Sequence, residues 1–248
     1  FPAASAAPLQ LDGTTLRITG DLQAGLKAGG PFHFFAENIP ATGTPQFTFS
    51  NGLGGTVAAT GLVVDRARGL VAGTVPGGAA SGPATFSVGA VSAAPVLANV
   101  APGVAPTLPY TFSGTVLDSN SNVVPGTVLI LMEQDPSNPD CNANPSLVSF
   151  GVSDASGNFS LPYTDGNLIL MGLPPVAANI PAGYIMQGDA SGDISGMTLQ
   201  LLTGPTYTMR IVQGSPATPV PNARVSLDGN VFDTRLSAAD GTVSFPIW

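Results

Sequence analysis

The chain has 248 residues, a net charge of −8 and a pI near 4.2, and its composition includes 31 Gly, 24 Pro and only 9% charged residues. So many Gly and Pro exclude long helices, while 44% hydrophobic residues argue against disorder. The seven basic residues form no cluster that could neutralise phosphates, which excludes nucleic acid as a partner. Short strands joined by frequent turns remain, so we predict an all-β protein. No apolar run approaches the roughly 20 residues of a membrane helix, so we expect no membrane insertion.

The N-terminal segment starts without Met, as a mature chain does after removal of a signal peptide, although a cloning boundary would look the same. We therefore expect a secreted, extracellular protein. Pro2 and Pro8 cannot donate to a strand ladder and count against pairing here. Apart from Ser5, one side of an extended strand would still be apolar. The residues on that side form our candidate inter-subunit strand, and they are Phe1, Ala3, Ala7, Leu9 and Leu11.

Residues 1–92 are predicted to form a first sandwich, with the N-terminal segment at its start. Within it, Phe-Thr-Phe at 47–49 precedes an apolar strand, an Asp-led turn around Gly and a Gly-Thr-x-Pro exit over 61–76. A further strand follows at 84–88. Over about residues 32–92 this order resembles the bacterial immunoglobulin-like or cadherin-like repeat. That resemblance implies an immunoglobulin-like sandwich with no activity of its own.

Residues 93–108 are rich in Pro and Ala, with prolines at 95, 102 and 106. Such a composition favours an extended and fairly stiff connection. We expect a linker here, which could also contribute an edge strand.

The second half of the chain contains an internal repeat. In each copy a strand leads through Val-Pro into an apolar strand, and a turn around Gly then leads into a final strand that ends in Pro. The Asp, Asn and Gly of this turn are the residues that tight hairpins require. The matching segments are 110–116, 124–131 and 152–162 in the first copy, and 207–212, 220–227 and 236–246 in the second.

This motif order resembles the carboxypeptidase-regulatory-like or transthyretin-like module, which is close to the B-type repeats of bacterial surface adhesins. The resemblance covers about residues 109–203 once and 206–248 in part. It implies a second sandwich at 109–204 and a further transthyretin-like module, the third module, at 205–248. The fold class is therefore tandem immunoglobulin-like and transthyretin-like β-sandwiches. The module serves as spacer and scaffold in many extracellular proteins, so it indicates a fold more than a function.

The third module looks incomplete. After Leu161-Pro162 the second sandwich continues for about forty residues with further strand-like runs, whereas the sequence stops two residues after Phe245-Pro246. A sandwich without its closing strands exposes apolar core and unpaired backbone, which is costly unless something covers them. We therefore predict an acceptor surface in the third module, made by Val225, Leu227, Val243 and Phe245. Completion by the chain's own linker and a sequence cut short within this module are the competing interpretations.

Catalytic chemistry finds little support in the sequence. His33 is the only histidine and lies in an aromatic strand, so no serine or cysteine triad is indicated. Glu37 and Glu133 are the only glutamates, and most aspartates lie in turns. Cys141, the only cysteine, cannot form an intrachain disulfide and is either an inert thiol or an intermolecular crosslink. We predict that the protein is not an enzyme.

Calcium is the ion best suited to the loops, because it takes Asp and Asn oxygens. The candidate ligands are Asp189 and Asp193, within residues 188–196. The loop lacks EF-hand spacing, so an ordinary turn is the competing interpretation, and no other cofactor is expected.

Low charge, small residues and tandem sandwiches favour a structural subunit of an extracellular filament, pilus or surface layer at the cell surface. Its subunits would join head to tail by β-strand donation, so the main partners would be copies of the chain itself. Other surface proteins and glycans are further candidate partners. The alternative is a spacer, adhesion or carbohydrate-binding segment of a larger secreted protein. A carbohydrate site would need an aromatic platform, for which the chain offers one Trp and four Tyr.

Overall fold

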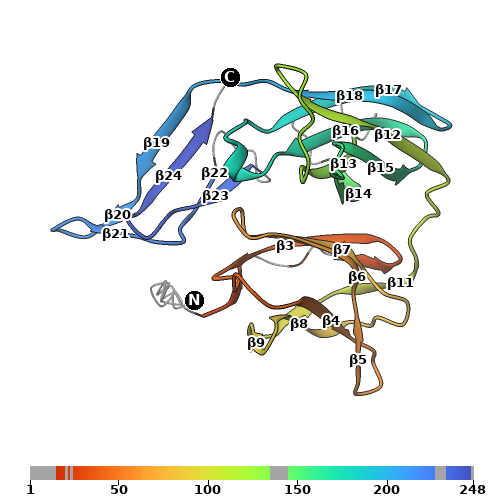
Figure 1. Ribbon diagram of the computed structural model, residues 1–248. Helices are drawn as coiled ribbons and strands as arrows, with labels where there is room; N and C mark the ends of the chain where they lie inside the picture. Colours follow the sequence, from red (N-terminus) through yellow and green to blue (C-terminus); the bar gives the residue numbers. More distant parts are fainter. Residues whose placement is uncertain (1–14, 20–21, 23–24, 135–144, 227–232, 247–248) are drawn as a thin grey trace, which may run out of the picture.

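The computed structural model describes residues 15–19, 22, 25–134, 145–226 and 233–246. Strands dominate these residues, and the single helical element among them is the 3-10 turn η1 (Val176–Ala178). The predicted all-β fold is thereby confirmed. Figure 1 shows β1 to β11 in the lower part of the molecule, β12 to β18 in the upper part, and β19 to β24 to one side.

The first sandwich encloses an aromatic core between two sheets. One sheet has the order β1 (Arg17–Thr19), β3 (Pro31–Glu37), β7 (Leu70–Thr74), β6 (Thr60–Asp65). The other has the order β10 (Val96–Ala98), β8 (Gly82–Val88), β4 (Pro45–Ser50), β5 (Thr56–Ala58), with β9 (Val91–Ser92) also paired to β8. Alternation along β3 turns Phe32 and Phe34 inward against Phe47, Phe49 and Phe86.

The segment expected as a linker carries two strands. In addition to β10, β11 (Val100–Val104) pairs in parallel with β2 (Leu26–Ala28) of the first sandwich. Ala93 and Ala98 are buried in the aromatic core. Residues 93–104 therefore pack as part of the first sandwich.

The second sandwich has a three-stranded and a four-stranded sheet. The first has the order β15 (Asn158–Tyr163), β12 (Tyr110–Asp118), β18 (Ile194–Leu201). The second has the order β14 (Ser146–Val152), β13 (Val128–Gln134), β16 (Gly166–Leu173), β17 (Gly183–Ala190). β12 pairs with β18 in parallel, and every other pair in these two sheets is antiparallel. Phe112, Leu129, Leu161 and Leu199 meet in the core.

The described residues of the third module form three strand pairs. They are β19 (Thr206–Arg210) with β24 (Thr242–Pro246), β20 (Val212–Gln213) with β21 (Thr218–Pro219), and β22 (Arg224–Ser226) with β23 (Thr234–Leu236). All three pairs are antiparallel.

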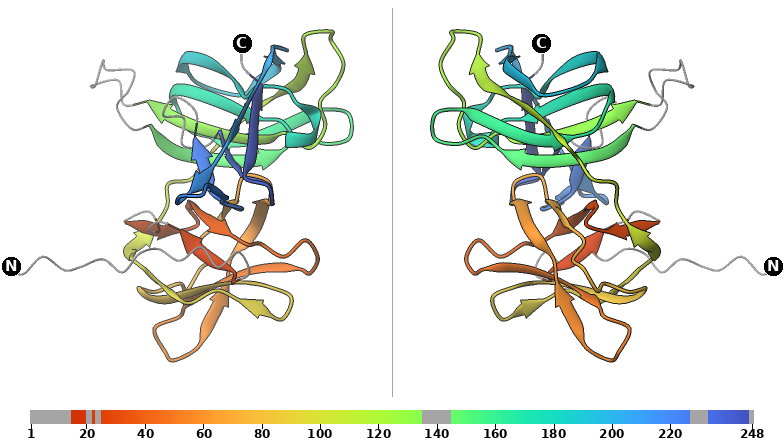
Figure 2. Two further views of the ribbon diagram at one scale, coloured as in Figure 1. Left: turned by 90° about the vertical axis from the view of Figure 1, so that its left-hand side faces the viewer. Right: turned by 90° about the vertical axis from the view of Figure 1, so that its right-hand side faces the viewer.

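The two sandwiches pack directly on each other. Val128, Ile130 and Met132 alternate with the core residues of β13 and point to its outer face, where they form an apolar cluster with Leu70 of the first sandwich. Phe35 packs at the edge of this cluster. In Figure 2 the strands of the third module run down to the waist between the two sandwiches. The two sandwiches therefore share an apolar interface and are not independent domains joined only by a linker.

Candidate assembly surface

The third module reproduces the backbone hydrogen bonds of the second sandwich, which establishes residue-by-residue equivalence between the two. In both, one residue in or directly after the first strand donates its N–H to the carbonyl of the turn glycine, and its own carbonyl accepts the N–H of the valine in the Val-Pro pair. These bonds join Val116 to Gly157 and Val124, and Ile211 to Gly241 and Val220. The registers agree as well, since Val128 faces Val152 and Arg224 faces Leu236 at equivalent positions.

A buried serine holds the same corner in both copies. The hydroxyl of Ser153 donates to the carbonyl of Val124 at 2.9 Å and accepts the N–H of Thr127 at 2.9 Å. Ser237 donates to the carbonyl of Val220 at 2.6 Å and accepts the N–H of Ala223 at 2.9 Å. Sequence reasoning missed this role, although both serines lie at the same position of the repeat. The sequence repeat therefore corresponds to a repeat in the structure, in which β19, β22, β23 and β24 match β12, β13, β14 and β15.

The two copies differ in what flanks these four strands. In the second sandwich β12 lies between β15 and β18, and β13 lies between β14 and β16. Among the described residues of the third module, β19 pairs only with β24, and β22 pairs only with β23. One edge of β19 and one edge of β22 therefore lack the neighbours that their counterparts have. A sheet edge of this kind is a template for pairing with another strand.

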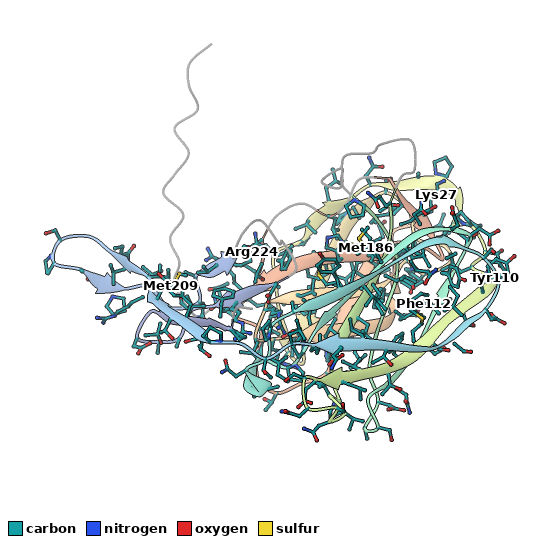
Figure 3. All side chains as sticks on the ribbon, turned by 90° about the horizontal axis from the view of Figure 1, so that it is seen from above. Lys27, Tyr110, Phe112, Met186, Met209 and Arg224 are labelled. Atoms are coloured by element: carbon teal, nitrogen blue, oxygen red, sulfur yellow. The ribbon has the colours of Figure 1, made fainter. Side chains whose placement is uncertain are left out.

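The missing neighbours change the exposure of equivalent side chains. Phe112 faces Leu161 across the β12–β15 pair and is completely buried. Its counterpart Tyr207 faces Phe245 across the β19–β24 pair and is 54% exposed. Figure 3 shows Phe112 in the crowded body of the molecule and Met209, also on β19, on the slender extension formed by the third module. The open side of β19 is thus the candidate assembly surface.

The predicted acceptor residues are covered more fully than the sequence indicates. Val243 and Phe245 are buried, Val225 is half-buried, and Leu227 lies outside the described residues. β23 packs against β24, and the guanidinium of Arg235 lies over the Phe245 ring, 5.4 Å from its centroid. The candidate donor residues Phe1, Ala3, Ala7, Leu9 and Leu11 also lie outside the described residues.

A turn of the first sandwich anchors the third module. Buried Arg68 pairs with Asp65 at 2.8 Å and lies 3.6 Å from Asp233 of the third module. The turn closes tightly at Gly69, where φ is +67° and a Cβ would lie 2.3 Å from the carbonyl of Ala36.

Four further contacts between the first sandwich and the third module surround this ion pair. They are Asn222 Nδ2 to Asn38 Oδ1 at 2.7 Å, Thr234 Oγ1 to Arg68 O at 3.2 Å, Leu236 N to Ala67 O at 3.2 Å, and the Arg224 guanidinium 4.4 Å from the Phe35 centroid. The sequence feature that could have indicated this junction is the presence of Arg66 and Arg68 shortly after Asp65, in a chain with only 9% charged residues. The third module is docked by these contacts, so its open edge has a fixed orientation.

The two calcium candidates have different environments. The Asp193 carboxylate accepts the N–H of Thr111 at 2.8 Å. Asp189 lines a hollow with Glu133 and Asp165, and its N–H donates to Asn167 Oδ1 at 2.9 Å. Over the described ranges, no group of three or more His, Cys, Asp or Glu side chains is placed to hold a metal ion. Calcium binding at Asp189 and Asp193 stays a prediction.

His33 lies on β3 in apolar surroundings between the two sandwiches, near Val63, Leu70 and Val128. Burial lowers the pKa of its imidazole below the ordinary value of 6.5. A neutral imidazole packed among apolar side chains indicates a structural role for His33. Cys141 lies outside the described residues.

Comparisons with known proteins give distant likenesses in structure alone. No family model and no curated protein match the chain, so the specific repeat families indicated by resemblance stay predictions. The chain is similar to the major pilin subunit BcpA of Bacillus cereus in its D312A form, with 12% identity, 75% of this chain and 70% of that chain covered, and a TM-score of 0.26. It is also similar to a streptococcal ancillary pilin, with 13% identity, coverage of 84% and 80%, and a TM-score of 0.27. The adhesin InvE of Yersinia pseudotuberculosis is similar with 13% identity, with 89% of this chain and 73% of that chain covered, and with a TM-score of 0.23. In the part of the chain that the structure describes, no helix is long and apolar enough to cross a membrane.

Proposed function

We propose that the chain is a structural subunit of an extracellular filament, pilus or surface layer, joined head to tail by donation of a β-strand to the third module. One observation carries this proposal. The third module repeats four strands of the second sandwich, while its described residues contain no counterpart of β18, which flanks β12, or of β16, which flanks β13.

The open edge has a physical cost that an incoming strand would remove. Unpaired N–H and C=O groups and the half-exposed Tyr207 ring face solvent where Phe112 is enclosed by β18. An added strand would pair with this backbone, and its alternating apolar side chains would fill the core positions. The contact would be head to tail, and such a contact propagates into a filament unless its rotation closes a ring.

A second copy of the chain carries a segment suited to this role. Leu9 and Leu11 alternate along residues 1–14, which precede the first described residue. Eleven extended residues span up to about 40 Å, longer than the five-residue strand β19. The contacts between the first sandwich and the third module also support head-to-tail assembly. A third module held in a fixed position on the first sandwich would give every subunit the same orientation relative to the next.

A spacer or adhesion segment of a larger secreted protein is the second candidate. The direct packing of the two sandwiches through Leu70, Val128 and Ile130 favours it, because stiff rods made of such modules hold a binding region away from a surface. In that case the open edge would be closed by sequence of the same protein.

Electron microscopy and sedimentation of the purified chain test the proposal. We expect concentration-dependent filaments with an axial repeat, and we expect their loss on deletion of residues 1–11. Leu9→Asp with Leu11→Asp should abolish assembly, whereas Gln10→Asp, which adds a charge on the opposite side of the same segment, should retain it. Monodisperse rods at every concentration would favour the spacer, and filaments that survive the deletion would show that residues 1–11 are not the donor.

A further inference from the structure

The outer face of the four-stranded sheet in the second sandwich is apolar across three strands. Two rows of side chains cross β13, β16 and β17, and neighbours within each row face one another in the strand registers. The rows are Ile130, Met171 and Tyr184, and Met132, Ile169 and Met186. Ile185, between the two row members on β17, packs into the sandwich core instead. Alternation along the strands therefore puts both rows on the same face of the sheet.

The first sandwich covers only one end of these rows. The members on β13 are buried in the apolar cluster between the two sandwiches, and the members on β16 are half-buried at its edge. On β17, Tyr184 and Met186 are 56% and 55% exposed. Figure 1 shows β14 next to the first sandwich and β17 on the far side of the sheet. The interface between the sandwiches thus continues into an exposed apolar surface, the β17 face, formed by Tyr184, Met186 and the adjoining β16 members.

β17 is also an open edge of its sheet. Among the described residues it pairs only with β16. Its eight residues include no Pro, and its register shift and its one charge, Asp189, lie in its last four residues. The first half of the strand therefore lacks the features that usually keep an edge from pairing. By contrast, β18, the other eight-residue edge strand of this sandwich, turns the polar residues Thr198 and Gln200 outward.

We propose that the β17 face binds the β17 face of a second copy, with the two β17 strands antiparallel about a two-fold axis at Ile185. A self-complementary surface is what such an isologous contact requires. Because the side-chain period of a strand is two, this register keeps the exposed side chains of both copies on one face. Tyr184 of each copy then lies opposite Met186 of the other, and a thioether beside an aromatic ring is a favourable contact. Each apolar row runs on into a row of the second copy, and the two Asp189 carboxylates lie at opposite ends of the contact.

This contact is separate from the proposed head-to-tail joint, because it uses β17 and not the third module. Where filaments form, it joins two of them side by side. Where none form, it joins two subunits into a dimer. The lateral contact and strand donation can therefore succeed or fail independently.

Sedimentation velocity of the full chain, with electron microscopy of the same samples, tests the contact. Tyr184→Asp with Met186→Asp sets like charges opposite each other, so it should weaken lateral association at least about tenfold and leave single filaments. Tyr184→Lys with Met186→Asp should restore most of the association, because only the antiparallel register sets each new cation opposite a new anion. Thr198→Asp with Gln200→Asp is the matched control, since it adds the same charges to the polar edge strand β18 and should change nothing.

The outcomes separate this contact from strand donation. Dimers of the full chain that are lost in the double-Asp variant would support the contact even if no filament forms, which would contradict only the proposed function. Unchanged lateral association in that variant, an equal loss in the β18 control, or no recovery in the Lys and Asp variant would overturn the contact. Loss of the filaments themselves would overturn it too, because β17 would then belong to the head-to-tail joint. If the double-Asp variant fails to fold by circular dichroism, Tyr184→Thr with Met186→Thr decides the question, and the contact requires that it also weakens lateral association.

Discussion

The second sandwich and the third module are two copies of one four-stranded unit in different states of closure. Both use the same turn, the same buried serine and the same strand registers. The second sandwich continues into three more strands, β16 to β18, and buries Phe112, whereas Tyr207 of the third module is 54% exposed. The comparison teaches that local hydrogen bonding suffices to define the unit. In the second sandwich the core is closed by β16, β17 and β18, which have no counterpart among the described residues of the third module.

The largest expected contrast is between equivalent aromatic residues of the two copies. Phe112→Ala should destabilise the second sandwich by about 3 to 5 kcal/mol, because it opens a cavity in a closed core. Tyr207→Ala should cost below about 1 kcal/mol in the monomer, since its ring is largely in water. Urea unfolding at concentrations too low for assembly measures both changes. Similar losses at the two positions would show that the third module is closed in the monomer.

Removal of Arg68 tests whether the third module is docked. Arg68→Ala leaves Asp65 and Asp233 without their buried partner, and we expect a loss of about 3 kcal/mol at the junction. Hydrogen exchange should speed up in β22 and β23 and stay unchanged in the core strands β12 and β13. Arg66→Ala is the control, because Arg66 lies in the same turn but donates to Pro40 O of its own sandwich. An effect of equal size in the control would argue against a specific junction.

The two serines should respond alike, because their hydrogen bonds are the same. Ser153→Ala and Ser237→Ala each remove the acceptor of a backbone N–H at a buried position, and we expect each to cost about 1 to 3 kcal/mol. Thermal unfolding of each variant, followed by circular dichroism, measures the loss. A clear effect in only one copy would break the equivalence that the hydrogen bonds indicate.

The smallest expected effect is a pH dependence from His33 in the first sandwich. Because burial lowers the folded-state pKa, the unfolded chain binds a proton first as the pH falls. The stabilising contribution is therefore complete above the unfolded pKa of about 6.5 and is lost as the pH falls toward the folded value. His33→Leu should flatten this part of the pH–stability curve and leave assembly unchanged. Loss of assembly in this variant would contradict the structural role of His33.

Patterns local in sequence predicted much of the fold. Alternation placed Phe32 and Phe34 in the core, and the Gly-centred turns of the repeat placed Gly157 and Gly241 at equivalent corners. The pairing of residues 96–104 with the first sandwich was harder to predict, because a Pro-rich segment is typical of a linker. Its strands β10 and β11 pair with β8 and β2, which lie earlier in the chain.

Features formed by residues far apart in the sequence were beyond these patterns. Part of the cover over the predicted acceptor residues comes from Arg235, whose guanidinium lies 5.4 Å from the Phe245 ring centroid. The docking of Arg224 on Phe35 joins residues far apart along the chain in the same way. Neither contact has a local signature, so only the three-dimensional structure shows them.

Hydrogen exchange of the β19 backbone as a function of protein concentration tests the central claim most directly. In the dilute monomer, residues 206–210 should exchange much faster than their equivalents, residues 111–115 of β12. In the assembled state they should become protected to a similar degree, and deletion of residues 1–11 should prevent that protection. Protection of β19 that is already complete in the monomer, or that never rises with assembly, would contradict closure of the third module by a second copy.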